Sequence, residues 1–275
     1  SPDCRVALCT LQAMTENQST AHPPETVEGW YALHQIFRST EPEAAHAKLT
    51  AMEGSDLPSG RGWSRWVRLI GSPADVMLMH FRPTLDDIAS AQDASRHWIS
   101  SLGLELIYSF LSITEAGLYH ITAKLASNAE SRGGKVGDAE YIAEMSERVR
   151  AELESDHVKR RLYPQPSADM PYVCFYPMSK RRDAGQNWYT LSLEERSRLM
   201  HAHGLTGRKY AGRIQQIITG AIGLDAWEWG VTLFGRDPLD FKRIVTEMRF
   251  DEVSAKYAEF GDFYVGKILS ASEEA

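Results

Sequence analysis

Hydrophobic and polar residues alternate along two separated stretches of the chain in the same order of six elements. In the first stretch the pattern predicts strands at 27–38, 65–70, 75–81 and 104–115 and helices at 41–52 and 85–99. In the second stretch it predicts strands at 172–180, 213–219, 227–234 and 263–269, a helix at 192–203 and a long helix after 237–238. Each stretch therefore reads strand, helix, strand, strand, helix, strand, which is the order of a ferredoxin-like unit.

An antiparallel sheet with helices on one face needs its other face covered, and a second copy of the unit provides that cover. We therefore predict an α+β fold in which two ferredoxin-like modules pack as a dimeric α+β barrel within one chain. The predicted parts are a flexible N-terminal extension (1–25), an N-terminal module (26–115), an insertion or linker with a helix (116–171) and a C-terminal module (172–275). The insertion helix, at 138–155, has an apolar stripe that we expect to be packing.

Composition excludes several classes of protein. Hydrophobic residues make up 43% and charged residues 24% of the 275 residues, as in an ordinary globular protein. The net charge of -7 argues against a nucleic-acid partner, and no apolar run approaches the roughly 18 residues of a membrane span. Cys4, Cys9 and Cys174 form neither a disulfide framework nor a zinc spacing, which favours a reducing cytoplasm.

The strand 172–180 carries the first candidate chemistry. Side chains alternate between faces, so Tyr176, Met178 and Lys180 share one face, and Pro177 and Ser179 lie on the other. Lys180 could direct a cation at a buried anion, or it could reach water along its aliphatic stem. Proline cannot donate to a ladder, so Pro177 predicts an edge or bulged position.

The helix predicted at 192–203 carries the second candidate chemistry. Ser192 is a suitable N-cap and Gly204 a suitable residue just past the end. His203 shares the apolar face of Leu199, whereas His201 points elsewhere. A histidine in the last turn feels the negative end of the helix dipole, which favours donation to a cation. The position suits a metal ligand, and it also suits a core histidine with satisfied hydrogen bonds.

Two further features are polar. Gln216 alternates with Ile214 and Ile218, so its amide needs a buried network or a ligand, because an unpaired amide costs about 1–3 kcal/mol. Basic residues cluster at 159–161 and 180–182, which suits either a ligand with several carboxylates or a solvated face. The sequence shows no glycine-rich phosphate loop, zinc motif, nucleophile elbow or cysteine-based haem attachment motif.

Several longer motifs lie in the second stretch. They are YVCFYPMSKRR (172–182), NWYTL (187–191), MHAHG (200–204), GRKYAGRIQQIITG (207–220), WEWGVTL (227–233), EMRFDEVSAKY (247–257) and FYVG (263–266). Together they resemble the coproheme decarboxylases of the chlorite dismutase superfamily, in the form found in Gram-positive bacteria. The resemblance covers nearly all of 172–269. It is weaker in the first module, where it is carried mainly by residues 29–31.

The resemblance implies a reaction and an assembly. Hydrogen peroxide oxidatively decarboxylates two propionates of iron coproporphyrin III to vinyl groups, giving haem b and carbon dioxide in the last step of a coproporphyrin-dependent route. The porphyrin binds in the C-terminal module, and the subunits form a homopentamer in the cytoplasm. A transient contact with the upstream iron-inserting chelatase is also implied, with no nucleic-acid partner and no membrane span.

The resemblance also assigns roles residue by residue. His203 matches the axial iron ligand. Tyr176 matches the catalytic tyrosine, which is oxidised to a radical and takes a hydrogen atom from the propionate. Lys180 and Ser254 match propionate-binding positions, and Gln216 matches the distal glutamine over the peroxide side of the iron. The remaining expected contacts with the porphyrin are Arg161, Tyr119, Pro177, Met178 and Ser179.

Two alternatives stay open at this point. A chlorite dismutase or haem peroxidase would use the same pocket, but chlorite dismutases place an arginine at the position of Gln216. A non-catalytic haem-binding or haem-delivery protein would have no task for the Tyr176 and Lys180 pair. Both features favour the decarboxylase.

Overall fold

The computed structural model describes residues 21–51 and 61–269, so most of the predicted N-terminal extension lies outside the described residues. The first module comprises β1 (Thr26–Ser39), α1 (Pro42–Ala51), β2 (Trp63–Leu69), β3 (Val76–Arg82), α2 (Leu85–Ser101) and β4 (Leu104–Gly117). The second comprises β5 (Tyr172–Lys180), α6 (Leu193–Arg208), β6 (Ile214–Gly220), β7 (Trp229–Gly235), α7 (Pro238–Arg249), α8 (Glu252–Tyr257), β8 (Ala258–Phe260) and β9 (Tyr264–Ile268).

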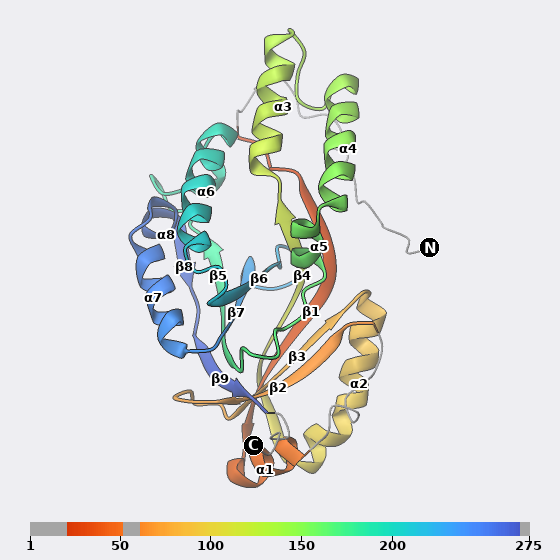
Figure 1. Ribbon diagram of the computed structural model, residues 1–275, viewed down its shortest axis with the longest axis vertical. Coiled ribbons are helices and arrows are strands. Elements are labelled where there is room, and N and C mark those ends of the chain that lie inside the picture. Colours follow the sequence, from red (N-terminus) through yellow and green to blue (C-terminus); the bar gives the residue numbers. More distant parts are fainter. Residues whose placement is uncertain (1–20, 52–60, 270–275) are drawn as a thin grey trace.

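The strands form a closed barrel (Figure 1). The first module contributes the order β4-β1-β3-β2 and the second the order β6-β7-β5-β9, and all the ladders are antiparallel. Short ladders join the two sheets at both edges, between β4 and β6 and between β2 and β9. The predicted α+β barrel of two ferredoxin-like modules is therefore confirmed.

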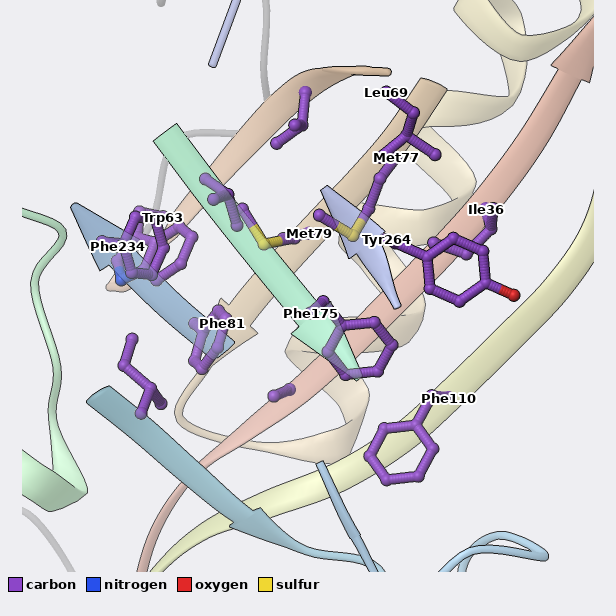
Figure 2. Close-up of a cluster of buried hydrophobic side chains, with 14 of the residues drawn as sticks. Ile36, Trp63, Leu69, Met77, Met79, Phe81, Phe110, Phe175, Phe234 and Tyr264 are labelled. Atoms are coloured by element: carbon purple, nitrogen blue, oxygen red, sulfur yellow. The ribbon is translucent and has the colours of Figure 1, made fainter. Parts of the chain in front are cut away.

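The interior of the barrel is apolar and aromatic. Trp63 stacks on Phe81 with ring centroids 4.2 Å apart, and Phe175 and Phe234 reach the same cluster from the second module (Figure 2). His34 is fully buried among these rings, stacked on Phe175 at 4.1 Å. Burial lowers the pKa of His34 to about 3, so it is a neutral member of the core.

The insertion forms three helices, α3 (Tyr119–Ser131), α4 (Ala139–Glu154) and α5 (Asp156–Leu162). The predicted apolar stripe of α4 packs as expected, since Tyr141, Met145 and Val149 are buried in one cluster with Leu125 of α3. The sequence pattern did not predict α3 or α5. Helix α3 also contacts α6, which ties the insertion to the second module.

The predicted end of α6 was wrong, and for Pro177 only the edge alternative is excluded. Helix α6 does not end before Gly204 but continues to Arg208. A Cβ at Gly207 would lie 3.3 Å from Gln216 Nε2, so this glycine inside α6 lets the helix approach strand β6 closely.

Strand β5 is not an edge, because β7 flanks one side and β9 and β8 flank the other. Pro177 lies where β9 gives way to β8, and its carbonyl accepts a hydrogen bond from Gly261 N at 2.9 Å.

None of the helices in residues 21–51 and 61–269 combines the length and apolarity needed to cross a bilayer.

Replacing Phe175 by alanine tests the barrel interior. The side chain is fully buried, so Phe175→Ala should lower the free energy of unfolding by about 3–5 kcal/mol, measured by urea denaturation. The matched control is Phe250→Ala, because Phe250 is 86% exposed and its loss should cost less than about 0.5 kcal/mol. Equal effects of the two substitutions would contradict the described interior.

Candidate functional site

The outer face of the second module gathers the predicted chemistry. Residues opposite each other in an antiparallel ladder point to the same face. Tyr176 is opposite Val231, and Met178 is opposite Trp229. Gln216 joins the same face two strands away, opposite Leu233. Helices α6, α7 and α8 lie on the same side of the barrel as this face (Figure 1), and α7 packs on it through Phe241 and Ile244.

Tyr176 is held by aromatic contacts. Its side chain is only 5% exposed, and its ring stacks on Phe263 with centroids 4.4 Å apart, with Phe260 at 5.9 Å. Burial raises the pKa of the Tyr176 phenol, and nearby Cys174 adds to the rise. The phenol therefore keeps its proton at neutral pH.

Asp251 orients His203. Its Oδ2 lies 2.8 Å from His203 Nδ1, while its Oδ1 accepts a hydrogen bond from Ser254 N at 2.9 Å as the N-cap of α8. Burial alone would raise the pKa of Asp251, but hydrogen bonds from His203 and Ser254 outweigh it and leave the pKa below its usual value. An anionic Asp251 favours a proton on Nδ1, which leaves the Nε2 lone pair available to a metal.

Lys180 is a buried cation whose ammonium has no direct ion pair among the described residues. Its side chain is 8% exposed, and its Nζ lies 4.6 Å from the ring centroid of Trp188. Burial lowers the pKa of Lys180 to about 8, although Asp251 and Glu228 favour the charged form. Within the described residues no hydrogen bond or ion pair reaches its ammonium. A ligand carboxylate would supply the missing partner.

Tyr119, from the insertion, contacts the same tryptophan as Lys180. It lies in the first turn of α3, and its ring meets Trp188 edge-on with centroids 6.5 Å apart. Trp188 thus has Lys180 over its face and Tyr119 at its edge. Tyr119 and Lys180 are thus brought together by their contacts with one tryptophan.

Gln216 faces the helix that carries His203. Its Nε2 approaches Gly207, which is one helical turn beyond His203 on α6. His203 is half-buried and His201 is exposed, as the helical phase predicted. His203 on α6 and Gln216 on β6 therefore lie at the same interface between the helix and the outer face of the sheet.

The structure places the remaining predicted residues on different faces. Met178 lies on the outer face next to Tyr176, and Ser254 is buried in α8. Pro177 and Ser179 alternate away from that face, and Ser179 Oγ accepts a hydrogen bond from Glu228 N at 3.2 Å. Arg161 is exposed on the last turn of α5, where its charge acts on Glu115 of β4.

Sequence reasoning missed two charged residues of this site, Asp251 and Arg249. The guanidinium carbon of Arg249 lies 3.7 Å from the ring centroid of Phe260, and its charge lowers the pKa of Tyr176 against the effect of burial. Both residues belong to the run 247–257 that carried the resemblance. Periodicity did not single them out, because a charged residue at the end of a helix usually faces solvent.

Comparison with known proteins places this geometry in a family. The family model described as chlorite dismutase matches residues 42–269. The chain belongs to the chlorite dismutase family. A coproheme decarboxylase from Staphylococcus carnosus is 39% identical over 260 residues, covering 89% of this chain and 94% of the relative. A coproheme decarboxylase from Thermus thermophilus is also 39% identical, over 92% of this chain and 94% of the relative.

Solved structures agree with this assignment. A structure described as a novel heme-binding protein from Thermus thermophilus is 40% identical, with a TM-score of 0.69 over 90% of this chain and 93% of that one. Chlorite dismutase from Candidatus Nitrospira defluvii, in complex with imidazole, is 19% identical with a TM-score of 0.58, covering 88% of this chain and 91% of that one. The second likeness concerns the fold alone.

The buried charge of Lys180 should cost stability. Its pKa falls from 10.5 to about 8 on folding, so Lys180→Met should raise the free energy of unfolding by about 3 kcal/mol at pH 7. Below pH 8 the lysine is charged in both states and the penalty is full. The penalty fades as the pH rises from about 8 to 10.5, where the unfolded chain also loses its proton. Urea denaturation at pH 7 and pH 10 checks both parts, and an unchanged or lower stability at pH 7 would contradict the buried charge.

Proposed function

We propose that this chain is a coproheme decarboxylase, which uses hydrogen peroxide to convert two propionates of iron coproporphyrin III into vinyl groups, giving haem b. The observation that carries the proposal is the shared outer face of Tyr176, Lys180 and Gln216 opposite the helix of His203. The curated relatives from Staphylococcus carnosus and Thermus thermophilus carry the same activity in their names.

The residues fit an iron porphyrin with carboxylate substituents. His203 would hold the iron through Nε2, because Nδ1 is engaged by Asp251. Lys180, Ser254 and Arg161 are the proposed propionate partners, and the buried ammonium of Lys180, which has no ion pair within the described residues, supports its part of this set. Met178 would line the porphyrin face, and Pro177 and Ser179 would shape the strand beneath it. When bound, the substrate supplies the redox centre on which peroxide is consumed.

Each decarboxylation balances as one propionate carboxylate, one hydrogen peroxide and one proton giving one vinyl group, one carbon dioxide and two waters. The contribution of the chain is to place a hydrogen-atom acceptor beside the propionate. Burial keeps the Tyr176 phenol protonated, so its oxidation releases an electron and a proton together. It returns to the phenol when it takes a hydrogen atom from the propionate chain, while Lys180 holds the carboxylate.

Gln216 favours a decarboxylase over a chlorite dismutase. A neutral amide offers a hydrogen bond to a peroxide but no fixed positive charge for an oxyanion. Non-catalytic haem binding is the second candidate, because one solved relative is described only as heme-binding. That role would leave Tyr176 without a task.

On the family resemblance we also propose a cytoplasmic homopentamer that meets the iron-inserting chelatase transiently. Sedimentation velocity of the purified protein tests the oligomer directly.

One experiment distinguishes the three functions. The protein is mixed with iron coproporphyrin III, hydrogen peroxide is titrated in, and the porphyrin mass is followed. Sequential loss of two carboxyl groups supports the decarboxylase. In a parallel sample with chlorite in place of peroxide, oxygen release without such loss supports a chlorite dismutase, and tight binding without turnover in either sample supports haem delivery.

Tyr176→Phe should bind iron coproporphyrin III within about twofold of the wild type yet lose decarboxylation by a factor of roughly 10² or more. The ring still stacks on Phe263, so only the hydroxyl is lost. Tyr172→Phe is the matched control, since Tyr172 lies on the same face of β5 and should keep its activity. Full activity of Tyr176→Phe would exclude the proposed hydrogen-atom transfer.

Asp251→Asn separates the two tasks of this residue. Asparagine is also a good N-cap, so α8 should persist by circular dichroism. Loss of the anion behind His203 should weaken iron ligation by about 10–100-fold and raise the reduction potential of the bound iron. Asp240→Asn is the control, because Asp240 pairs with Arg213 and Arg243 outside the site. An unchanged potential in Asp251→Asn would refute the orienting role.

A further inference from the structure

Strand β5 exchanges one neighbouring strand for another in the middle of the candidate site. Phe175 is opposite Tyr264 of β9, and Met178 is opposite Phe260 of β8. Between these two pairs β5 has two residues, whereas the connection from β8 to β9 has three, 261–263. The connection therefore carries one extra residue, as in a β-bulge, and such an insertion redirects the side chains beside it.

The extra residue brings two phenylalanines to the same face. In a regular strand, residues three positions apart point to opposite faces, so Phe260 and Phe263 would be separated. Phe260 packs on the outer face of the second module, and Tyr264 belongs to the barrel interior (Figure 2). Because of the insertion, Phe263 also lies on the outer side, where its ring stacks on Tyr176.

Gly261 lets the connection lie close against β5. Its N–H donates to the carbonyl of Pro177 at 2.9 Å. A Cβ at this position would lie 2.7 Å from Pro177 Cγ and 3.1 Å from Trp227 Cζ2. Both neighbours are rigid rings, so a side chain at residue 261 would push the connection away from β5. The glycine therefore determines how closely Phe263 can approach the ring beneath it.

The two phenylalanine rings contact Tyr176 in different ways. Phe263 is nearly parallel to it, with centroids 4.4 Å apart and an interplanar angle of 24°, whereas Phe260 is tilted by 51° at 5.9 Å. Arg249 holds Phe260 through a cation–π contact. Tyr176 is buried, but Phe263 is 37% exposed. A ring this exposed adds less to folding than a core phenylalanine, while it restricts the plane of the buried phenol directly.

We propose that Phe263 is a positioning residue for Tyr176, which fixes the plane and tilt of the phenol ring so that its hydroxyl meets a substrate propionate in one orientation. This inference rests on the proposed function. Transfer of a hydrogen atom depends steeply on how the two groups approach, and a displacement of about 1 Å can lower the rate by about 10²-fold. The stack orders the phenol before the substrate arrives, so the substrate does not have to order it.

Phe263→Leu tests the proposal, with Phe263→Tyr as the conservative variant and Phe250→Leu as the control. Leucine keeps an apolar contact with Tyr176 but cannot stack on it, whereas tyrosine keeps the ring. Both substituted side chains are exposed, so all three variants should fold. Crystal structures of the substrate-free proteins give the orientation of the Tyr176 ring. The Kd for iron coproporphyrin III is measured without peroxide, and the rate of carboxyl loss is measured by porphyrin mass after hydrogen peroxide is added.

In Phe263→Leu we expect the Tyr176 ring to be tilted or to adopt several orientations. The Kd should stay within about twofold of the wild type, and the rate of carboxyl loss should fall by about tenfold or more. Phe263→Tyr should keep the ring orientation and the rate, and Phe250→Leu should match the wild type in all three measurements.

An unmoved Tyr176 ring or a wild-type rate in Phe263→Leu would overturn the proposal and leave the decarboxylase function standing. A loss of affinity as large as the loss of rate would also overturn it, because Phe263 would then act in binding. No carboxyl loss in the wild type itself would refute the decarboxylase function, and the proposal with it.

Discussion

Closure of two sheets into one barrel is the constraint on which the rest of this structure depends. Because the barrel is closed, alternate side chains of its strands point into a shared aromatic interior around Phe175, Trp63 and His34. The other residues must face the helices. Polar chemistry is therefore confined to the outer face, and in the second module this face carries Tyr176 and Lys180 under α6, α7 and α8.

The site has features that do not stabilise the free protein. Within the described residues the buried ammonium of Lys180 has no direct hydrogen bond or ion pair, and the side chain of Gln216 lies against a helix that has only a glycine at the contact. By contrast, Asp251 has two tasks, because one carboxylate both caps helix α8 and orients the His203 ring. The proposed iron porphyrin, with its carboxylate substituents, accounts for the buried ammonium of Lys180 and the orientation of His203 together.

Alternation and helical phase predicted both modules, the barrel, the shared face of Tyr176 and Lys180, and the inward side of His203. They did not predict the end of α6, because Gly204 lies inside the helix instead of ending it, and Gly207, one turn beyond His203, serves close packing against the sheet. They also missed Asp251 and Phe263 as residues of the site. Each contacts a partner far away in sequence, His203 for Asp251 and Tyr176 for Phe263, and such pairs are set by the tertiary fold.

The central claim is that iron coproporphyrin III lies between α6 and the outer face of the second module. A crystal structure of the protein with this porphyrin, without peroxide, tests it most directly. The account predicts a bond from the iron to His203 Nε2, with one propionate at the Tyr176 hydroxyl and its carboxylate near Lys180. Iron bound to another residue, or a porphyrin bound on the first module, would contradict it.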